Sequence, residues 1–227
     1  PAAGGQILQA PQAGGKPPLV EVYLVAVSKT ETERYKRIMT GAGLNLRALE
    51  LENSALIRAL VGNDRAPVAV VNIGGRSSTI LIVENGVERV SRNYEVGGEE
   101  ITQAIARSLK IGLERAEELK RNLGSQPENL ELITGAMASL VDLIAFETKK
   151  TIHNFEDLRK VKVGQVLLVG GLANMPAFVT YFTNRLGLPV QLGNPLARVV
   201  APPGLEPIKG ELNSTFAIAL GLALREV

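Results

Sequence analysis

Residues 68–83, VAVVNIGGRSSTILIV, decide the fold class, because two apolar runs flank a turn of small and hydroxylated residues. Residues 166–176, VLLVGGLANMP, place glycines directly after a second apolar run further along the chain. Short apolar runs bounded by glycine predict buried strands. Glycine at the end of a strand lets backbone N–H groups approach phosphate oxygens closely. Two such turns, with helical segments between and after them, predict a nucleotide held between the turns.

The rest of the chain alternates predicted strands and helices, which is typical of a mixed α/β fold. Strands are expected at 20–28 and 46–51, on either side of a helix that opens with a capping box at residues 30–33. The Asn85–Gly86 pair predicts a tight hairpin after the first glycine turn. Further helices are expected from Glu99 onward and at 113–123, 128–155, 175–186 and 215–225. The pair Gly97–Gly98 is expected to end the strand that precedes Glu99, and the Pro/Gly-rich residues 198–210 are expected to form a loop.

Composition excludes several kinds of chemistry. The 227 residues are 45% hydrophobic and carry a net charge of +2, which is ordinary for a globular protein. The basic residues are dispersed, so no nucleic-acid partner is expected. No apolar run approaches the ~20 residues of a membrane helix, so no direct membrane insertion is expected. The absence of cysteine and a single histidine exclude disulfides, thiol catalysis and a Ser-His-Asp triad within one chain, and fit a cytoplasmic protein.

The two glycine turns supply the candidate binding residues. In the first turn, glycines expected at positive φ, hydroxyl donors and one charge are candidate phosphate ligands: Gly74, Gly75, Arg76, Ser77, Ser78 and Thr79. In the second turn, the candidates are Gly170, Gly171, Leu172 and Met175. The alternatives are an irregular hairpin and a strand-to-helix turn that needs glycine for packing. Neither turn has the G-x-G-x-x-G or P-loop pattern, so dinucleotide binding and Walker-type chemistry lose support.

Two further segments have both a functional and a structural interpretation. Glu117, Glu118 and Lys120 lie on a predicted helix between the turns and could reach a ribose, but charges at this spacing are more often a solvated helix face. The small residues of 215–223 would let a helix pass close to a ligand, although tight helix packing explains them equally simply.

Taken in order, these pieces resemble the superfamily of actin, sugar kinases and heat-shock chaperones. Its actin-like (ribonuclease H-like) fold is a mixed sheet with flanking helices, here expected to carry a small inserted α/β subdomain. Within it, three phrases are most similar to the PilM family of type IV pilus assembly ATPases. They are VSRNYEVGGEEITQAIA at 90–106, AEELKRNLG at 116–124 and FAIALGLAL at 216–224. Residues 22–60 resemble the small subdomain and the return into the first domain.

The resemblance implies a cytoplasmic scaffold of type IV pilus assembly that binds ATP or ADP with Mg²⁺. It implies docking of the cytoplasmic tail of the inner-membrane protein PilN, self-association, and a peripheral place at the inner membrane through these partners. It places the phosphates at residues 74–79 and the ribose or base near Glu117 and Lys120. It places the base and sugar at Gly170, Gly171, Leu172 and Met175.

The chain departs from the family pattern in two ways. No D-x-G phosphate motif precedes Asn72, so the first part of domain I is expected to be absent. Asn72 itself stands where the family commonly has aspartate, and an amide ligates Mg²⁺ less strongly and takes no proton from water. We therefore expect Asn72 to be only an indirect Mg²⁺ ligand. Both departures weigh against hydrolysis more than against binding.

The expected domain organisation follows from the resemblance. Residues 1–18 would form a linker or arm, and 19–66 would be the remaining part of domain I with the small subdomain. Residues 67–214 would form the nucleotide-binding domain II, and 215–227 a C-terminal connecting helix. The alternatives are an FtsA-like cell-division homologue of actin, an active ATPase, or a sugar-kinase-type phosphotransferase.

Overall fold

A computed structural model describes residues 22–122, 127–175 and 177–226 of the chain. The chain divides into two compact units, one of residues 1–50 with Val227 and one of residues 51–226. The predicted arm at 1–18 lies outside the described residues, and the predicted domain boundaries stay a prediction.

The first unit contains helix α1, Lys29–Gly41. The predicted helix is confirmed, but the prediction of its cap is wrong. Ser28 is the N-cap, because its Oγ accepts a hydrogen bond from the backbone N–H of Glu31 at 3.3 Å. α1 buries none of its residues, and Tyr35 and Ile38 are half exposed on it.

The segments that flank α1 are not strands. Residues 22–28 and 44–50 have no regular secondary structure, so the strands predicted there are wrong for these residues. A strand exists only with a hydrogen-bonded neighbour, and the described part of this unit offers no such neighbour. Apolar side chains that suit a strand, such as Val22, Leu24 and Val27, are therefore exposed.

The second unit is built on a five-stranded mixed sheet of order β3-β2-β1-β4-β5. The strands are β1 (Val68–Ile73), β2 (Ser78–Glu84), β3 (Val87–Tyr94), β4 (Gln165–Val169) and β5 (Val190–Leu192). β1, β2 and β3 pair antiparallel, whereas β4 pairs parallel with both β1 and β5. Asn85 and Gly86 have φ values of 55° and 71°, which confirms the predicted tight hairpin.

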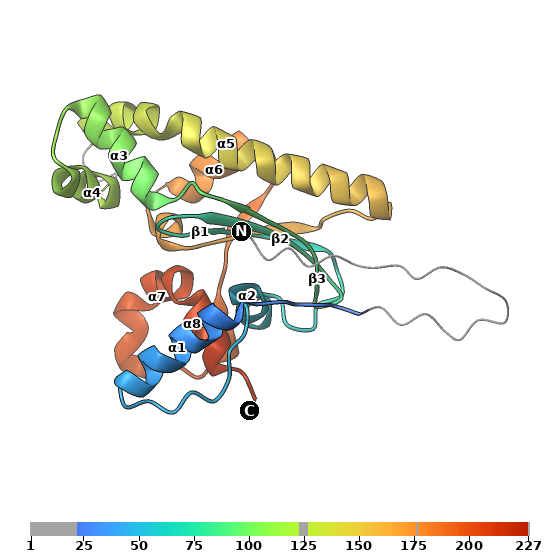
Figure 1. Ribbon diagram of the computed structural model, residues 1–227. Helices are drawn as coiled ribbons and strands as arrows, with labels where there is room; N and C mark the ends of the chain where they lie inside the picture. The colour runs from blue at the N-terminus through green and yellow to red at the C-terminus, as the bar shows by residue number, and fades with distance from the viewer. Residues whose placement is uncertain (1–21, 123–126, 176, 227) are drawn as a thin grey trace. The chain divides into compact units, whose positions relative to one another are not determined.

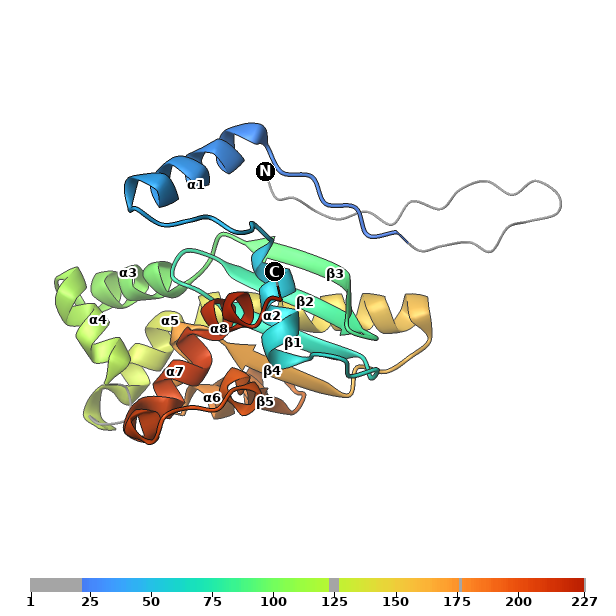
Figure 2. The same cartoon turned by 90° about the horizontal axis from the view of Figure 1, so that it is seen from below.

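Helices cover both faces of this sheet (Figure 1). On one face lie α3 (Gly98–Leu109), α5 (Pro127–Arg159) and α6 (Phe178–Leu186), with α4 (Leu113–Arg121) packed on α3. On the other face lie α2 (Glu52–Leu60) and α8 (Ala217–Ala223), which Figure 2 shows side by side. The mixed α/β architecture with flanking helices is confirmed.

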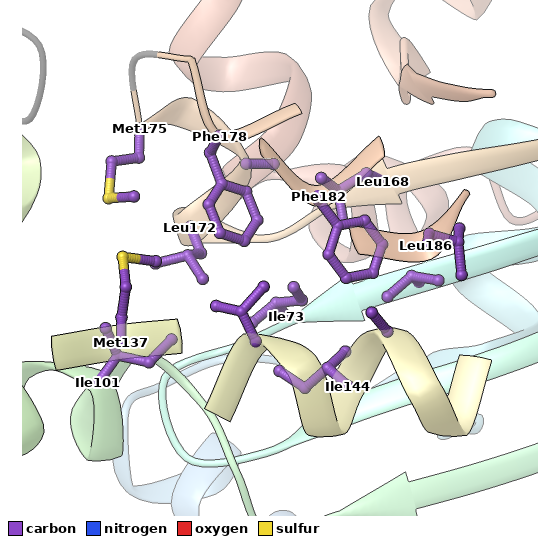
Figure 3. Packing of buried hydrophobic residues seen from close by; sticks show 14 of the residues in the cluster. Ile73, Ile101, Met137, Ile144, Leu168, Leu172, Met175, Phe178, Phe182 and Leu186 are labelled. Carbon is purple, nitrogen blue, oxygen red and sulfur yellow. The ribbon is translucent and has the colours of Figure 1, made fainter. Parts of the chain in front are cut away.

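Each face has its own hydrophobic core. The larger core joins the sheet to α3, α5 and α6, and Figure 3 shows Phe178 and Phe182 reaching toward Ile73 and Ile144. The smaller core lies beneath α2 and α8 and centres on Leu56. Successive residues of a strand point alternately into the two cores. Both faces of the strands are therefore buried, and their sequences are continuous apolar runs.

The C-terminal region differs from its prediction. Residues 195–198 and 203–208 form 3₁₀ turns, and Lys209–Thr215 forms helix α7, where a loop was expected as far as Gly210. The helix expected at 215–225 breaks at Phe216 and continues as α8. A Cβ at Gly221 would lie 2.0 Å from the carbonyl oxygen of Ala55, so α8 owes this glycine to tight packing on α2.

The helix expected at 175–186 also begins later. A 3₁₀ turn at Gly171–Asn174 precedes α6, which starts at Phe178, and Pro176 lies outside the described residues. Within the described ranges, no helix has the length and apolar character required to cross a membrane.

Candidate functional site

The two glycine turns meet because β1 and β4 are parallel neighbours whose carboxyl ends lie at the same edge of the sheet. Gly170 follows β4 with a φ of 99°, a conformation that favours glycine. A Cβ at this position would lie 2.1 Å from the carbonyl oxygen of Ile73, the last residue of β1. The backbone N–H of Gly170 donates to the carbonyl of Ser214 at 2.9 Å. Only glycine therefore lets the second turn lie directly against the first.

The first turn supports the start of α3. The N–H groups of Gly98 and Glu99 donate to the carbonyls of Gly74 and Gly75, at 2.9 and 2.8 Å. A Cβ at Gly97 would lie 2.5 Å from the carbonyl oxygen of Gly75. Neither Gly74 nor Gly75 has a positive φ, so the prediction of positive φ there is wrong.

A cavity of about 840 Å³ lies between the turns, α4 and α7, in the size range of small-molecule sites. Seven of the predicted site residues line it: Gly74, Gly75, Glu117, Lys120, Gly171, Leu172 and Met175. Nine lining residues were not predicted: Gly98, Glu99, Arg121, Ala173, Asn174, Leu192, Gly210, Glu211 and Thr215. The structure thus brings the two turns and the α4 charges together around one space.

The other predicted residues lie outside the lining. The Ser78 hydroxyl is buried and donates to the carbonyl of Val96 at 2.6 Å, and the Thr79 hydroxyl donates to Asn93 at 3.2 Å. Both hydroxyls therefore bond from β2 to β3 or to the residues that directly follow β3.

Asn72, Arg76, Ser77 and Gly170 also lie outside the lining. Asn72 lies within β1, between Thr79 of β2 and Val169 of β4. The Arg76 side chain is 87% exposed, with its Nε 3.5 Å from Glu99. The carbonyl of Ser77 closes the first turn by accepting from Gly74.

Lys120 and Glu117 form a compact polar cluster at the cavity. The Lys120 side chain is only 10% exposed, and its Nζ lies 2.6 Å from Glu117 Oε2. The same ammonium donates to the carbonyl of Gly98 at 3.0 Å and to Thr102 Oγ1 at 2.7 Å. Lys120 is therefore not part of a solvated helix face. Glu118, in contrast, is exposed and pairs with Arg115.

The cluster also lowers the pKa of Glu117. Burial opposes ionisation of this carboxyl, but hydrogen bonds from Lys120, Thr102 and Arg121 outweigh burial and lower the pKa of Glu117 to about 2. The carboxylate is therefore charged at neutral pH. It offers hydrogen-bond acceptors to the hydroxyl groups of a ligand.

Three of the nine missed lining residues, Gly210, Glu211 and Thr215, come from α7. Asn174 Nδ2 donates to Thr215 Oγ1 at 2.8 Å and to the carbonyl of Glu211 at 3.3 Å, which ties the second turn to α7. The Pro/Gly content of 198–210 had favoured a loop there, which hid Gly210 and Glu211. The Gly97–Gly98 pair was interpreted only as the end of a strand, although its close approach to the first turn was a usable signal.

The carboxylates that line the cavity are Glu99, Glu117 and Glu211. Among the described residues, no group of three His, Cys, Asp or Glu side chains could hold a metal ion. Glu99 is the cavity carboxylate that lies nearest to Gly75, whose added Cβ would be 3.8 Å from Glu99 Oε1. Mg²⁺ is commonly held by one or two carboxylates together with the phosphates of its substrate, so Glu99 would be the side chain beside Gly75 to hold it if a nucleotide with Mg²⁺ occupied the cavity.

Solved structures define the class of fold. The chain matches a PilM-PilN type IV pilus biogenesis complex with a TM-score of 0.76 and 24% identity, over 90% of this chain and 60% of that one. It matches the ethanolamine utilization protein EutJ from Carboxydothermus hydrogenoformans with a TM-score of 0.64 and 27% identity, over 86% and 62%. MreB5 of Spiroplasma citri bound to ADP follows, with a TM-score of 0.61 and 18% identity, over 87% and 65%. The protein has an actin-like fold.

The family is narrower than the fold. The family model described as type IV pilus assembly protein PilM matches residues 8–227. The chain therefore belongs to the PilM family, and the resemblance seen in its sequence is confirmed.

Curated relatives include the cell division protein FtsA. The Bacillus subtilis protein is 28% identical over 198 residues, covering 78% of this chain and 45% of the relative. A Helicobacter pylori protein is 26% identical over 236 residues, covering 90% and 47%. The chain thus spans less than half the length of these relatives. Their low identity fits a shared fold, and supports the FtsA-like alternative only weakly.

Proposed function

We propose that this chain is part of a type IV pilus assembly scaffold that binds ATP or ADP in the cavity between its glycine turns. In this proposal it also docks the cytoplasmic tail of a PilN-type inner-membrane protein. The observation that carries the proposal is the family match over residues 8–227, joined to a cavity at the meeting point of the two turns. The protein would lie in the cytoplasm, at the inner membrane through its partner.

The cavity suits a nucleotide in its size and in its polarity. Its glycine end leaves room for phosphates beside Gly74 and Gly75, and the Glu117 carboxylate offers acceptors for ribose hydroxyls. Leu172, Met175 and Leu192 supply apolar surface for a base. A fold neighbour supports the case by analogy, since MreB5 of Spiroplasma citri was solved with ADP and with AMPPNP.

Calorimetry on a matched pair of variants tests nucleotide binding. A side chain at Gly171 meets no atom within 4 Å and would project into the cavity lining, so Gly171→Glu adds bulk and negative charge without a clash. Gly204 is equally unobstructed but lies outside the lining, so Gly204→Glu is the control. We expect ADP binding to weaken roughly tenfold or more in Gly171→Glu alone. Equal binding by both variants, or no binding by the parent chain with or without Mg²⁺, would reject the site.

The first unit is the proposed docking surface for the tail peptide. Residues 22–60 resemble the family's small subdomain and the return into the first domain, and α1 buries none of its residues while exposing Tyr35 and Ile38. Exposed apolar side chains on one helix face are typical of peptide-binding surfaces. Val22 and Leu24 add further exposed apolar surface within the same unit.

Capture of a synthetic PilN-type tail peptide tests this placement. Ile38→Asp should weaken capture, because it puts a charge on the apolar face of α1. Thr40→Asp adds the same charge at another exposed position of the helix and should leave capture unchanged. Deletion of residues 20–51 should abolish capture. Full capture by the deleted chain would place docking elsewhere.

A further inference from the structure

The strand order gives the cavity two distinct ends. The first glycine turn follows β1, and Leu192 is the last residue of β5, which lies beyond β4 in the sheet. Gly74 and Gly75 therefore lie at one end of the lining, and Leu192 lies at the other. In the proposed function the phosphates lie beside the glycines, so the base of the nucleotide would lie at the β5 end.

Helix α7 borders the β5 end and is held there from two sides. The backbone N–H of Gly170, which follows β4, donates to the carbonyl of Ser214 at 2.9 Å. The backbone N–H of Leu196, in the 3₁₀ turn after β5, donates to Asn213 Oδ1 at 3.1 Å. The residues of α7 that line the cavity therefore lie beside the proposed position of the base.

Glu211 brings a carboxylate without a partner to this end of the cavity. It lies in the first turn of α7, lines the cavity and is exposed. Across residues 22–122, 127–175 and 177–226, its carboxylate takes part in no hydrogen bond or ion pair. Lys120 and Arg121, the basic residues of the lining, both pair with Glu117 instead. The carboxylate oxygens of Glu211 are therefore available to a ligand.

We propose that Glu211 selects the base by accepting a hydrogen bond from the exocyclic amino group of adenine. An ionised carboxylate only accepts hydrogen bonds. Adenine carries an amino donor at C6, whereas guanine and hypoxanthine carry a carbonyl acceptor at the same position. That carbonyl would face the negative charge with no proton between them, so the cavity favours a 6-aminopurine over a 6-oxopurine. This inference rests on the proposed function and adds to it the residue that determines specificity.

The other side chains at this end of the cavity do not distinguish these bases. The Thr215 hydroxyl can donate or accept, so it suits either base. The Asn174 amide is engaged on both sides, because it donates to Thr215 and accepts from the Ser214 hydroxyl. The apolar residues of the lining contact any purine ring alike. Discrimination at C6 therefore depends on Glu211.

Calorimetric titration of this chain with ADP and with inosine diphosphate, both with Mg²⁺, tests the assignment. In inosine diphosphate a carbonyl replaces the amino group at C6. We expect the parent chain to bind ADP roughly tenfold or more tightly than inosine diphosphate. Glu211→Gln should bring the two affinities close together, because the glutamine amide can accept from the amino group or donate to the carbonyl.

Glu206→Gln is the matched control for the loss of charge. Glu206 is exposed in the preceding 3₁₀ turn and lies outside the lining, so this variant should keep the preference of the parent for ADP. A carboxylate in the first turn of a helix also stabilises that helix. If Glu211 had only this structural role, Glu211→Gln would weaken both nucleotides equally and leave their ratio unchanged, which would overturn the assignment.

Two further results of the titration have distinct meanings. Equal binding of the two nucleotides by the parent chain, or tighter binding of inosine or guanosine diphosphate than of ADP, overturns the role of Glu211 and leaves the nucleotide site in place. No binding of ADP by the parent chain rejects the proposed function, and the assignment of Glu211 with it.

Discussion

Replacement of Glu117 by glutamine tests whether the polar cluster of α4 is held by charge. The variant keeps the shape of the side chain but leaves the Lys120 ammonium, whose side chain is 10% exposed, without its carboxylate. Hydrogen bonds from Lys120 to the Gly98 carbonyl and to Thr102 remain, so the loss is partial. We expect a less stable second unit with an unchanged fold.

The magnitude follows from the pKa of Glu117. A drop from 4.5 to about 2 on folding corresponds to roughly 3 kcal/mol of stability at neutral pH. The side chain is 35% exposed, so solvent screening reduces this to about 1 to 2 kcal/mol. For a domain of this size, the melting temperature should fall by about 2 to 8 °C.

Thermal melting followed by circular dichroism measures the effect and its pH dependence. Because folding lowers the pKa of Glu117, its stabilisation is fully present above the unfolded value of 4.5. It is lost as the pH falls toward 2. The parent and Glu117→Gln should therefore differ by a constant amount from pH 7 to 5 and converge below 4.5. Glu118→Gln, whose exposed carboxylate pairs with the exposed Arg115, should melt like the parent. A Glu118→Gln shift as large as that of Glu117→Gln, or a difference that grows on acidification, would refute the reasoning.

Three substitutions probe the packing. Phe182→Ala removes a fully buried ring stacked on Phe178, and urea unfolding should show a loss of about 3 to 5 kcal/mol. Gly221→Ala sets a Cβ 2.0 Å from the Ala55 carbonyl oxygen and should cost about 1 to 3 kcal/mol, since α2 and α8 must separate. Gly135→Ala meets nothing within 4 Å inside helix α5, so the same assay should show a gain of about 0.5 to 1 kcal/mol. A loss at Gly135→Ala or a neutral Gly221→Ala would contradict the helix packing described.

The sequence predicted the parts of the fold that depend on local pattern. Apolar runs ending in glycine located β1 and β4, and Asn85–Gly86 located the hairpin. The strands expected in the first unit failed because a strand also needs a neighbour, and an apolar alternating run carries no information about that neighbour.

The candidate site was only partly predictable for a similar reason. The need for glycine at position 170 could be inferred from its place in a turn at the end of a strand. Its contact with Ile73 follows from the parallel pairing of β1 and β4. The hydroxyls of Ser78 and Thr79 looked available, but their partners come from β3 and the residues after it. α7 reaches the cavity through the contact of Asn174 with Thr215, far along the chain. Direction of side chains and distant contacts are set by the tertiary fold, which no local pattern records.

Two hydrogen bonds in series connect α4, the start of α3 and the first glycine turn beside the cavity. Lys120 holds the Gly98 carbonyl, and the N–H of Gly98 in turn holds the Gly74 carbonyl. The peptide groups at the start of α3 are thus clamped from both directions, by α4 and by the first turn. A tilt of α4 would consequently displace the turn between β1 and β2 as well, so the two ends of the cavity lining would move together.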